Sequence, residues 1–327
     1  MKVLVAIFSV TDTWTIPGRH VGILRQRFPD LTFAHATDHD SMVREAADAD
    51  VAFSSLLRGD VLAGAPRLRW IHSSAAGVGS LLSAELKARR VLLTNSRGVH
   101  ADFIAEHVVA VTLMLFRKLH LAVRRQVEGR WAQAEMNAPP PPRLLRGAHV
   151  GVVGLGAIGT AVARAMAGLG AEVHGIRRRP GRERPHGVKR VGAPEELPAL
   201  LARADVVVLA APSTAETRGL IGRHELALMR RDAVLVNVAR GRLVEQDALA
   251  DALARGVIAG AALDVFEHEP PDPASPLWRL PNVVLTPHTA GFRADYWDVV
   301  TDLFSENLRR YRRGDTLLNV VDPEAGY

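Results

Sequence analysis

The sequence predicts an α/β protein with two domains, each built on a parallel sheet. Strand-like runs bounded by turn residues alternate with helical patterns along most of the chain, as is typical of parallel α/β units. The runs in the second half are continuously apolar, as expected of strands covered on both faces. With 327 residues, the chain is also long enough to bury two separate cores.

The first predicted domain occupies about the first hundred residues. Its strand candidates are Val3–Phe8, Val51–Ser54, Trp70–Ser73 and Val91–Thr94, and its helical stretches are Ile23–Phe28, Ser41–Ala47 and Ala84–Arg89. A long apolar helical pattern without Gly or Pro then covers Ala101–Arg125. The Pro run at Ala138–Arg143 is expected to form a stiff, extended connector.

The second predicted domain repeats the alternation up to Pro287. Its strand candidates are Val150–Val153, Glu172–Ile176, Val206–Ala210, Val234–Val236, Ala259–Leu263 and Val283–Leu285. After Pro287 a helical pattern extends to about Arg313, and Thr316–Val321 is expected to return to the first domain. We therefore assign residues 1–100 and 290–327 to one domain and residues 101–289 to the other.

The composition restricts the class of protein. An apolar fraction of 48% and a charged fraction of 23% are ordinary for a soluble globular protein. The absence of Cys excludes disulfides, thiolate metal sites and a thiol nucleophile. The short apolar run at Met1–Ser9 follows a single Lys and lacks a cleavage site, so a first buried strand is expected there rather than a signal peptide. No run approaches the roughly 18 apolar residues of a membrane span, and we expect a cytoplasmic protein without a membrane partner.

The formal net charge of +6 would allow an anionic partner. However, only four of the 41 basic residues are Lys, which indicates an Arg-biased composition. The Arg residues are scattered and lack the interleaved aromatic residues of a nucleic-acid surface. We therefore expect no nucleic-acid partner.

The segment from His149 to Gly159 has the pattern of a dinucleotide site. A strand-like run leads directly into Gly154-Leu155-Gly156-Ala157-Ile158-Gly159, and a helical run follows. Gly154 permits a tight turn, Gly156 allows the backbone to approach a pyrophosphate, and Gly159 lets the helix pack on the strand. The helix N-terminus offers unpaired N–H groups to the phosphates. Residues 101–289 are therefore predicted to be a Rossmann-like dinucleotide-binding domain.

The residues after the second strand of this domain predict the type of cofactor. A carboxylate at this position would accept hydrogen bonds from both ribose hydroxyls and would repel a 2′-phosphate. The chain instead has Arg177-Arg178-Arg179, which begins 18 residues after Gly159. Because a guanidinium suits phosphate, we expect NADP(H) in preference to NAD(H). The alternative is a solvated Arg run in an Arg-rich protein.

Three later segments place polar groups directly after strand candidates. Arg240 follows the run at Val234–Val236, carboxylates that include Asp264 and Glu269 follow the next run, and His288 follows the third. In an open parallel sheet, ligands bind beyond the carboxyl ends of the strands. These side chains are therefore expected at the same edge of the sheet as the glycine loop.

These motifs resemble those of the D-2-hydroxyacid dehydrogenase family, in its glyoxylate/hydroxypyruvate reductase-like branch. The resemblance extends from about Pro66 to Gly291, whereas residues 1–65 match only in general character. The matching motifs are Ser74–Val78, Ala105–His107, Gly154–Gly159, Asn237–Gly241, Ala262–Pro270 and Pro287-His288. The resemblance implies two Rossmann-like or flavodoxin-like parallel-sheet domains with the active site in the cleft between them. It also implies a homodimer built largely on the cofactor domain, and it makes residues 1–100 with 290–327 the substrate domain.

The resemblance also implies roles for individual residues. Arg240, Glu269 and His288 fall on the catalytic Arg, Glu and His of the family, and Asp264 falls on its nicotinamide-contacting Asp. Leu155, Ala157, Ile158 and Pro212 are assigned to the cofactor site with the three glycines and Arg177–Arg179. Ala76 and Gly77 fall on the loop that binds the substrate carboxylate through backbone N–H groups, with Arg240 and His288 as further substrate contacts. Gly79 stands where the family normally has Asp, which leaves the geometry of this loop open.

The chemistry of 2-oxo acid reduction agrees with these roles. Arg240 can bind the carboxylate and polarise the carbonyl. His288 can donate a proton to the developing alkoxide, and Glu269 can stabilise the imidazolium. Because the cofactor supplies the hydride, neither a metal nor a nucleophile is required. We therefore expect NAD(P)H-dependent reduction of a small 2-oxo acid, of the glyoxylate or hydroxypyruvate type, to the D-2-hydroxy acid.

Two kinds of alternative remain open on the sequence. One is a dehydrogenase of the same scaffold with another substrate, such as D-lactate, phosphite, 3-phosphoglycerate or a bulkier 2-oxo acid. A formate enzyme is disfavoured, because the family branch that oxidises formate has Gln where Glu269 stands. The other alternative is a nucleotide-sensing binding protein that resembles a corepressor.

Overall fold

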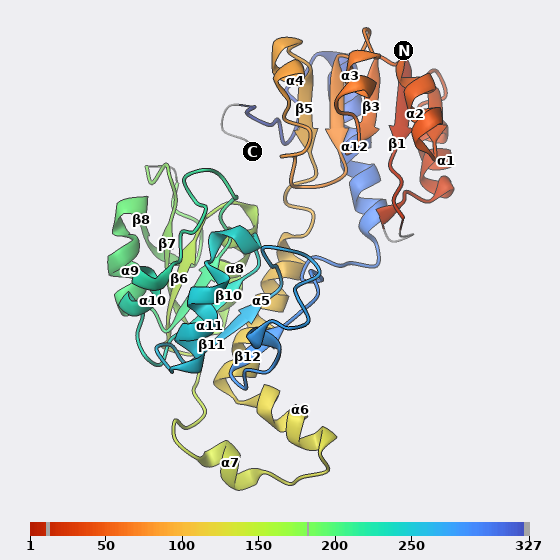
Figure 1. The fold of residues 1–327 in the computed structure, drawn as a ribbon. Coiled ribbons are helices and arrows are strands. Elements are labelled where there is room, and N and C mark those ends of the chain that lie inside the picture. The colour runs from red at the N-terminus through yellow and green to blue at the C-terminus, as the bar shows by residue number, and fades with distance from the viewer. Residues whose placement is uncertain (11–13, 182, 324–327) are drawn as a thin grey trace. The chain divides into compact units, whose positions relative to one another are not determined.

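The computed structural model describes residues 1–10, 14–181 and 183–323 of the chain (Figure 1). The last four residues of the predicted segment 290–327 thus lie outside the described part. The chain divides into two compact units. Unit 1 comprises Met1–Val99 and the chain from Arg293 onward, and unit 2 comprises His100–Phe292.

Unit 1 is built on a five-stranded parallel sheet with the strand order β2-β1-β3-β4-β5. This is the order of flavodoxin-like sheets. Its strands are β1 (Lys2–Ala6), β2 (Thr32–Ala36), β3 (Val51–Ser54), β4 (Trp70–Ser73) and β5 (Leu92–Asn95). Its helices are α1 (Gly18–Arg27), α2 (His39–Ala46), α3 (Asp60–Ala63), α4 (Ala84–Ala88) and α12 (Tyr296–Arg313).

The helices of unit 1 cover both faces of its sheet. On one face, α1 and α12 pack against Val3, Val5 and Phe53, while α2, α3 and α4 share the other face with Leu4 and Ile71. Consecutive residues of a strand point to opposite faces, so a strand covered on both sides must be apolar throughout. The inner strands β1, β3 and β4 are buried along almost their entire length, as expected for a parallel sheet covered on both faces.

The C-terminal segment of the described chain returns to unit 1. An antiparallel bridge joins Thr94 and Val320, and Val321 donates a hydrogen bond to the carbonyl of Leu93. This segment thus covers the outer edge of β5, as expected for Thr316–Val321, and it provides backbone partners that an edge strand otherwise lacks.

Unit 2 is built on a seven-stranded sheet with the order β12-β11-β10-β9-β6-β7-β8, and all its pairs are parallel. Its strands are β6 (His149–Val153), β7 (Glu172–Ile176), β8 (Val188–Gly192), β9 (Val206–Leu209), β10 (Val234–Asn237), β11 (Gly260–Leu263) and β12 (Val283–Leu285). The chain order reverses at β6, between β7 and β9, and ligands of such sheets bind at this switch point.

The helices of unit 2 also cover both faces of the sheet. Its α-helices are α5 (Ala101–Phe116), α6 (Leu119–Val127), α7 (Gln133–Asn137), α8 (Ala157–Gly168), α9 (Leu197–Arg203), α10 (Arg223–Leu228) and α11 (Gln246–Ala254). Three short 3-10 helices lie at Pro194–Glu196, Gly241–Leu243 and Pro276–Trp278. One core cluster joins α5 and α8 to the sheet, and a second joins α9, α10 and α11 to its other face. The predicted fold class of two parallel-sheet α/β domains is thus confirmed.

The predicted long helix over Ala101–Arg125 is wrong in one respect, because it is two helices. Lys118 has a left-handed conformation with φ 56° and separates α5 from α6. In a continuous helix the carbonyl of Phe116 would accept from the N–H of residue 120. Here it accepts from the N–H of Arg143, at 2.8 Å, whose guanidinium lies over the Phe116 ring. The returning connector therefore ends α5, although no Gly or Pro marks the break.

Two strands and one helix boundary also differ from the prediction. β2 and β8 are absent from the predicted strands, and both are edge strands whose sequences mix polar and apolar residues. The helical pattern after Pro287 begins only at Tyr296, because the backbone after β12 first forms a turn. Among the helices of the described chain, none is long and apolar enough to cross a membrane.

Candidate active site

The glycine loop joins β6 to α8 in a conformation that depends on its glycines. Gly154 has φ 99°, and a Cβ there would lie 2.6 Å from the backbone nitrogen of Ala211. A Cβ on Gly159 would overlap the carbonyl of Gly154. A Cβ on Gly156, in contrast, would meet nothing within 4 Å among the described residues, so space is open where Gly156 precedes α8. This cradle fits a dinucleotide pyrophosphate at the N-terminus of α8.

The residues predicted to contact the rest of the cofactor surround this loop. Leu155, Ala157 and Ile158 lie within it, and Pro212 directly follows Ala211, the residue against which Gly154 packs. Leu155 lies in the turn after β6, Ala157 and Ile158 begin α8, and Pro212 follows β9, the neighbour of β6 in the sheet.

The three arginines after β7 differ in their contacts. Arg177 is half-buried, and its guanidinium donates to the carbonyls of Pro180, at 3.4 Å, and Glu183, at 2.9 Å. Arg178 and Arg179 are exposed, and Arg178 pairs with Glu216 at 3.5 Å. The side chain of Arg177 therefore orders its own loop, while Arg178 and Arg179 extend from the loop toward solvent.

Arg240 lies in the turn after β10. The side chain of Asn237 holds this turn, because its amide donates to the carbonyl of Arg240, at 3.0 Å, and accepts from the N–H of Ala239, at 3.1 Å. Arg240 itself is exposed. A Cβ on Gly241 would overlap the backbone of Phe266, so the turn after β10 packs directly on the loop after β11.

Glu269 and His288 form a hydrogen-bonded pair. Oε2 of Glu269 lies 2.7 Å from Nδ1 of His288, and Oε1 accepts from the N–H of Phe266 at 3.0 Å. The His288 side chain is 52% exposed and that of Glu269 is 37% exposed. Because Nδ1 faces the carboxylate, Nε2 is the nitrogen of His288 that is available to a ligand.

Asp264 holds the turn that carries His288. Its buried carboxylate accepts from the Thr286 hydroxyl, at 2.6 Å, and from the N–H groups of Thr289, at 2.9 Å, and Ala290, at 3.0 Å. The N–H of His288 also bonds the carbonyl of Asp264, at 2.9 Å. His288 adopts φ 55°, a conformation that costs a non-glycine residue free energy unless its surroundings impose it. These hydrogen bonds provide that constraint.

In unit 1, three carbonyls of the loop after β4 accept hydrogen bonds from residues outside the loop. The Tyr296 hydroxyl donates to the carbonyl of Ser74 at 2.7 Å, and the Asn95 amide donates to that of Ala76 at 2.7 Å. The N–H of Ser96 donates to the carbonyl of Ala75 at 3.2 Å. The N–H groups of Ala76 and Gly77, however, have no hydrogen-bond partner within the described chain.

Gly79 is not required by the packing of this loop. A Cβ at this position would meet nothing within 4 Å among the described residues. Its backbone is also not left-handed, since Gly79 is absent from the glycines with positive φ. The residue type at position 79 is therefore free to vary without a steric penalty in this structure.

Residues 109–290 match the model of the D-isomer specific 2-hydroxyacid dehydrogenase NAD-binding domain. This range covers more than half of the chain. The chain belongs to the D-isomer specific 2-hydroxyacid dehydrogenase family. The predicted family is thus confirmed, and with it a nicotinamide cofactor.

Relatives of known name or structure cover almost the entire chain. A glyoxylate reductase of Korarchaeum cryptofilum is 35% identical over 319 residues, which are 95% of each protein. A family member from Xanthobacter autotrophicus Py2, solved with NADPH and MES, has a TM-score of 0.85 and 34% identity, covering 99% of each chain. The NADPH-dependent glyoxylate/hydroxypyruvate reductase of Sinorhizobium meliloti, solved with NADP and sulfate, has a TM-score of 0.83 and 26% identity over all of both chains.

Within this family fold, the structure adds residues that the sequence patterns did not single out. Asn237 and Thr286 shape the two turns, and His107 contacts Thr286 through Nε2 at 3.3 Å. Burial lowers the pKa of His107, and the charge of Asp264 opposes this effect. The motif Ala105–His107 was recognised only as part of the resemblance, and its spacing did not indicate a contact with the turn after β12.

Proposed function

We propose that this protein reduces a small 2-oxo acid, of the glyoxylate or hydroxypyruvate type, to the D-2-hydroxy acid with NADPH. The observation that carries the proposal is the Glu269–His288 pair. A buried carboxylate holds the turn of His288, and the loop of Glu269 packs on the turn of Arg240. A hydrogen-bonded acid and an exposed guanidinium are the two groups that carbonyl reduction of an oxo acid requires.

Each residue has a role that follows from its chemistry. Arg240 binds the substrate carboxylate and carbonyl oxygen through its planar fork. His288 gives the proton on Nε2 to the carbonyl oxygen as the C–O bond is reduced, and Glu269 stabilises the imidazolium through Nδ1. The free N–H groups of Ala76 and Gly77 suit a carboxylate oxygen. The bound nicotinamide supplies the hydride.

Other residues of unit 2 would hold the cofactor. The glycine loop and the N-terminus of α8 would bind the pyrophosphate, with Leu155, Ala157, Ile158 and Pro212 around it. Asp264 would hold the turn of His288 in place beside the nicotinamide, because both of its carboxylate oxygens accept hydrogen bonds from that turn. We accordingly propose residues 101–289 as the dinucleotide-binding domain and residues 1–100 with 290–327 as the substrate domain.

A substrate panel tests the reaction. Purified protein is incubated with NADPH or NADH and with glyoxylate, hydroxypyruvate, pyruvate or a bulkier 2-oxo acid, and absorbance is followed at about 340 nm. The expected result is the highest kcat/KM for glyoxylate or hydroxypyruvate with NADPH. If the protein binds NADPH but oxidises it with none of these acids, it is a nucleotide-binding protein without reductase activity and the proposal is wrong.

We propose a preference for NADPH because Arg178 and Arg179 are exposed at the end of β7, where the adenosine ribose of the cofactor is expected. Replacing Arg178 with Asp should lower the NADPH/NADH ratio of kcat/KM about tenfold or more, since a charge-assisted phosphate contact contributes about 1.5–3 kcal/mol. Arg19→Asp, an exposed change in unit 1, should leave the ratio unchanged. A wild-type preference for NADH would contradict the assignment.

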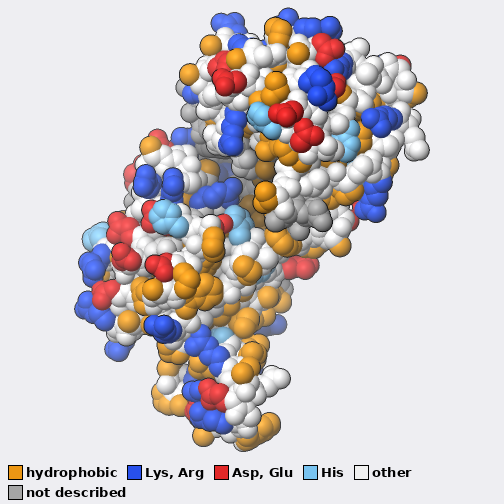
Figure 2. Space-filling view, turned by 45° about the vertical axis from the view of Figure 1, so that its right-hand side comes forward, with side chains coloured by type: hydrophobic (Ala, Val, Ile, Leu, Met, Phe, Trp, Pro, Cys, Tyr) orange, Lys and Arg blue, Asp and Glu red, His pale blue; other side chains and the backbone are white. Residues whose placement is uncertain are grey.

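We also propose that the protein is a homodimer built on unit 2. The segment with α6 and α7 projects from the rest of this unit (Figure 1) and exposes Val123, Val127 and Trp131, the last two at 85% and 91%. Hydrophobic side chains are visible on its surface in Figure 2. Contiguous exposed apolar side chains are typical of interfaces. Light scattering should therefore give twice the chain mass of 35.4 kDa.

A further inference from the structure

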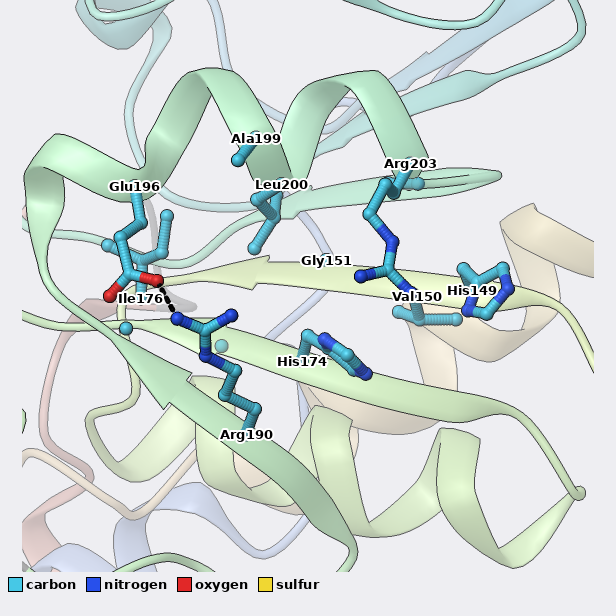
Figure 3. Close-up of a pocket in the computed structure, with 13 residues that line it drawn as sticks. His149, Val150, Gly151, His174, Ile176, Arg190, Glu196, Ala199, Leu200 and Arg203 are labelled. Carbon is cyan, nitrogen blue, oxygen red and sulfur yellow. Dashed lines mark hydrogen bonds and ion pairs between the residues drawn. The ribbon is translucent and has the colours of Figure 1, made fainter.

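Unit 2 contains a hollow that the proposed reaction does not use. It lies between α9 and the strands β6, β7 and β8, and it has a volume of about 70 Å³ (Figure 3). A site for one water needs roughly 10–15 Å³, so the hollow is large enough for a small organic ion. Its lining begins at His149, at the amino end of β6, and includes no residue of the glycine loop.

The strand register directs several basic side chains into this hollow. Gly151 of β6 is opposite His174 of β7, and His174 is opposite Arg190 of β8. Residues opposite each other in parallel strands share a face, and His149 shares it because it lies two residues before Gly151. A Cβ on Gly151 would overlap Leu200 of α9, so this is the face that α9 covers.

The basic side chains outnumber the acidic ones around the hollow. Glu196 forms an ion pair with Arg190 and accepts from the N–H of Ala193 at 3.0 Å. Nδ1 of His149 lies 3.8 Å from Glu172, a long contact with a half-exposed carboxylate that the register places on the same face of β7 as His174. Both carboxylates are therefore already used by one basic group each.

Arg203 and His174 retain their capacity to bind a ligand. Arg203 is exposed and His174 is half-buried. Among the residues that the structure describes, neither side chain forms an ion pair or a hydrogen bond. Figure 3 shows Arg203 reaching from α9 toward β6, with His174 standing on β7 below it. The rings of His149 and His174 are 6.4 Å apart and nearly perpendicular. A guanidinium and two imidazoles thus surround one small space.

Without a bound anion, the environment of His174 favours the neutral imidazole. Burial lowers the pKa of His174, and the charges of Arg203 and His149 lower it further. Arg190 acts in the same direction, whereas Glu172 acts in the opposite one. An anion in the hollow would reverse this balance and would favour the imidazolium, so its binding would be coupled to proton uptake.

We propose that this hollow is a second ligand site, which binds a small oxyanion: a carboxylate or phosphate group on a short chain. Arg203 and His174 contact the charged group, and Ile176 and Leu200 provide an apolar wall for the remaining atoms. The planar fork of Arg203 suits both carboxylate and phosphate. The volume restricts the ligand to a few heavy atoms.

The test follows the imidazole resonances of protein labelled with ¹⁵N-histidine, saturated with NADP⁺ so that the cofactor site is filled. The probes are propionate and inorganic phosphate, each titrated to about 100 mM, which detects binding as weak as the millimolar range. The His174 signal, identified by its loss in His174→Gln, should move toward the charged form with saturation. A response to only one probe identifies the charged group.

Two variants and one pH comparison make the result decisive. Arg203→Gln should weaken propionate binding at least tenfold, whereas Arg279→Gln, an exposed arginine elsewhere in unit 2, should not change it. Propionate should bind more tightly at about pH 6 than at about pH 8, because binding takes up a proton. Reductase activity of Arg203→Gln should remain at the wild-type level, which separates this site from the proposed reaction. An unmoved His174 signal, or equal binding by Arg203→Gln and wild type, would overturn the proposal.

Discussion

The loop after β4 in unit 1 and the turn after β12 in unit 2 are held by opposite sets of backbone groups. In unit 1, neutral donors from Tyr296 and Asn95 occupy the loop carbonyls and leave the N–H groups of Ala76 and Gly77 free. In unit 2, the Asp264 carboxylate occupies the N–H groups of its turn and leaves a side chain, His288, exposed. A loop that binds an anion through its backbone must turn its carbonyls away, whereas a turn that presents a side chain has no such requirement.

The two arrangements also differ in how strongly one residue controls them. A neutral hydrogen bond contributes about 0.5–1.5 kcal/mol, and a bond to a charged group about 1.5–3 kcal/mol. In unit 1, several neutral donors together hold the loop after β4. In unit 2, one buried carboxylate accepts three hydrogen bonds from the turn after β12. Single substitutions should therefore have larger effects on the turn of unit 2.

The largest effect is expected for the side chain that the turn presents. His288→Ala removes the proton donor and should lower kcat by roughly 10²–10⁴-fold, while NADPH affinity stays within error. Steady-state kinetics and fluorescence titration measure the two quantities. His268→Ala, a change at a neighbouring exposed histidine, is the control and should retain activity. A near-normal kcat in His288→Ala would show that His288 is not the proton donor.

The next effect is expected for the carboxylate that holds the turn. Asp264→Asn keeps the shape of the side chain, but one of its oxygens becomes an NH₂ group that faces hydrogen-bond donors. The free energy of unfolding should therefore fall by about 1.5–3 kcal/mol. Because His288 loses its fixed position, kcat should fall by about tenfold or more. The matched control is Asp251→Asn, whose carboxylate pairs with two arginines at the surface and should contribute about 1 kcal/mol or less. Denaturant unfolding and kcat distinguish the two, and equal effects would contradict the role of Asp264.

A smaller and more selective effect is expected for the loop of unit 1. Asn95→Ala leaves the Ala76 carbonyl without its donor, and KM for the 2-oxo acid should rise by about fivefold, equivalent to roughly 1 kcal/mol. Because the proposed role of Asn95 is to orient this loop and not to transfer a proton, kcat should change little. Asn307→Ala removes a similar amide-to-backbone bond elsewhere in unit 1, and it should lower stability without changing KM. A loss of kcat with unchanged KM in Asn95→Ala would show that the loop does not bind substrate.

The smallest effect is expected for the charge of Glu269. In Glu269→Gln the ring of His288 loses the carboxylate that faces Nδ1 and has a neutral amide there instead. Because both side chains are partly exposed, the charge should contribute about 0.6 kcal/mol, and kcat for reduction should fall by about threefold. Steady-state kinetics of wild type and Glu269→Gln provide the measurement, and an unchanged kcat would contradict the pairing.

The sequence predicted the central strands well because most of their residues are apolar. It missed β2 and β8 because Thr32–Ala36 and Val188–Gly192 are edge strands that mix polar and apolar residues, with neither a continuous apolar run nor a strict alternation. It also missed the break at Lys118, which depends on a hydrogen bond from a connector 25 residues further along the chain.

The predicted site residues lie at the strand ends that the sequence indicated, but the groups that hold them were not predictable. Tyr296 lies 222 residues from Ser74, and Ala290 lies 26 residues from Asp264. Such contacts leave no local pattern, since they depend on which strands become neighbours. The sequence therefore indicated which side chains follow these strands, whereas the hydrogen bonds that orient them required the structure.

Gly241 and Gly79 have different consequences for how such a protein can diverge. Any side chain at position 241 would push apart the turns that carry Arg240 and Glu269, because these turns touch through their backbones. At position 79 a new side chain meets open space. Proteins with this fold can therefore diverge at position 79 without a steric penalty, whereas position 241 requires Gly as long as the two turns remain in contact.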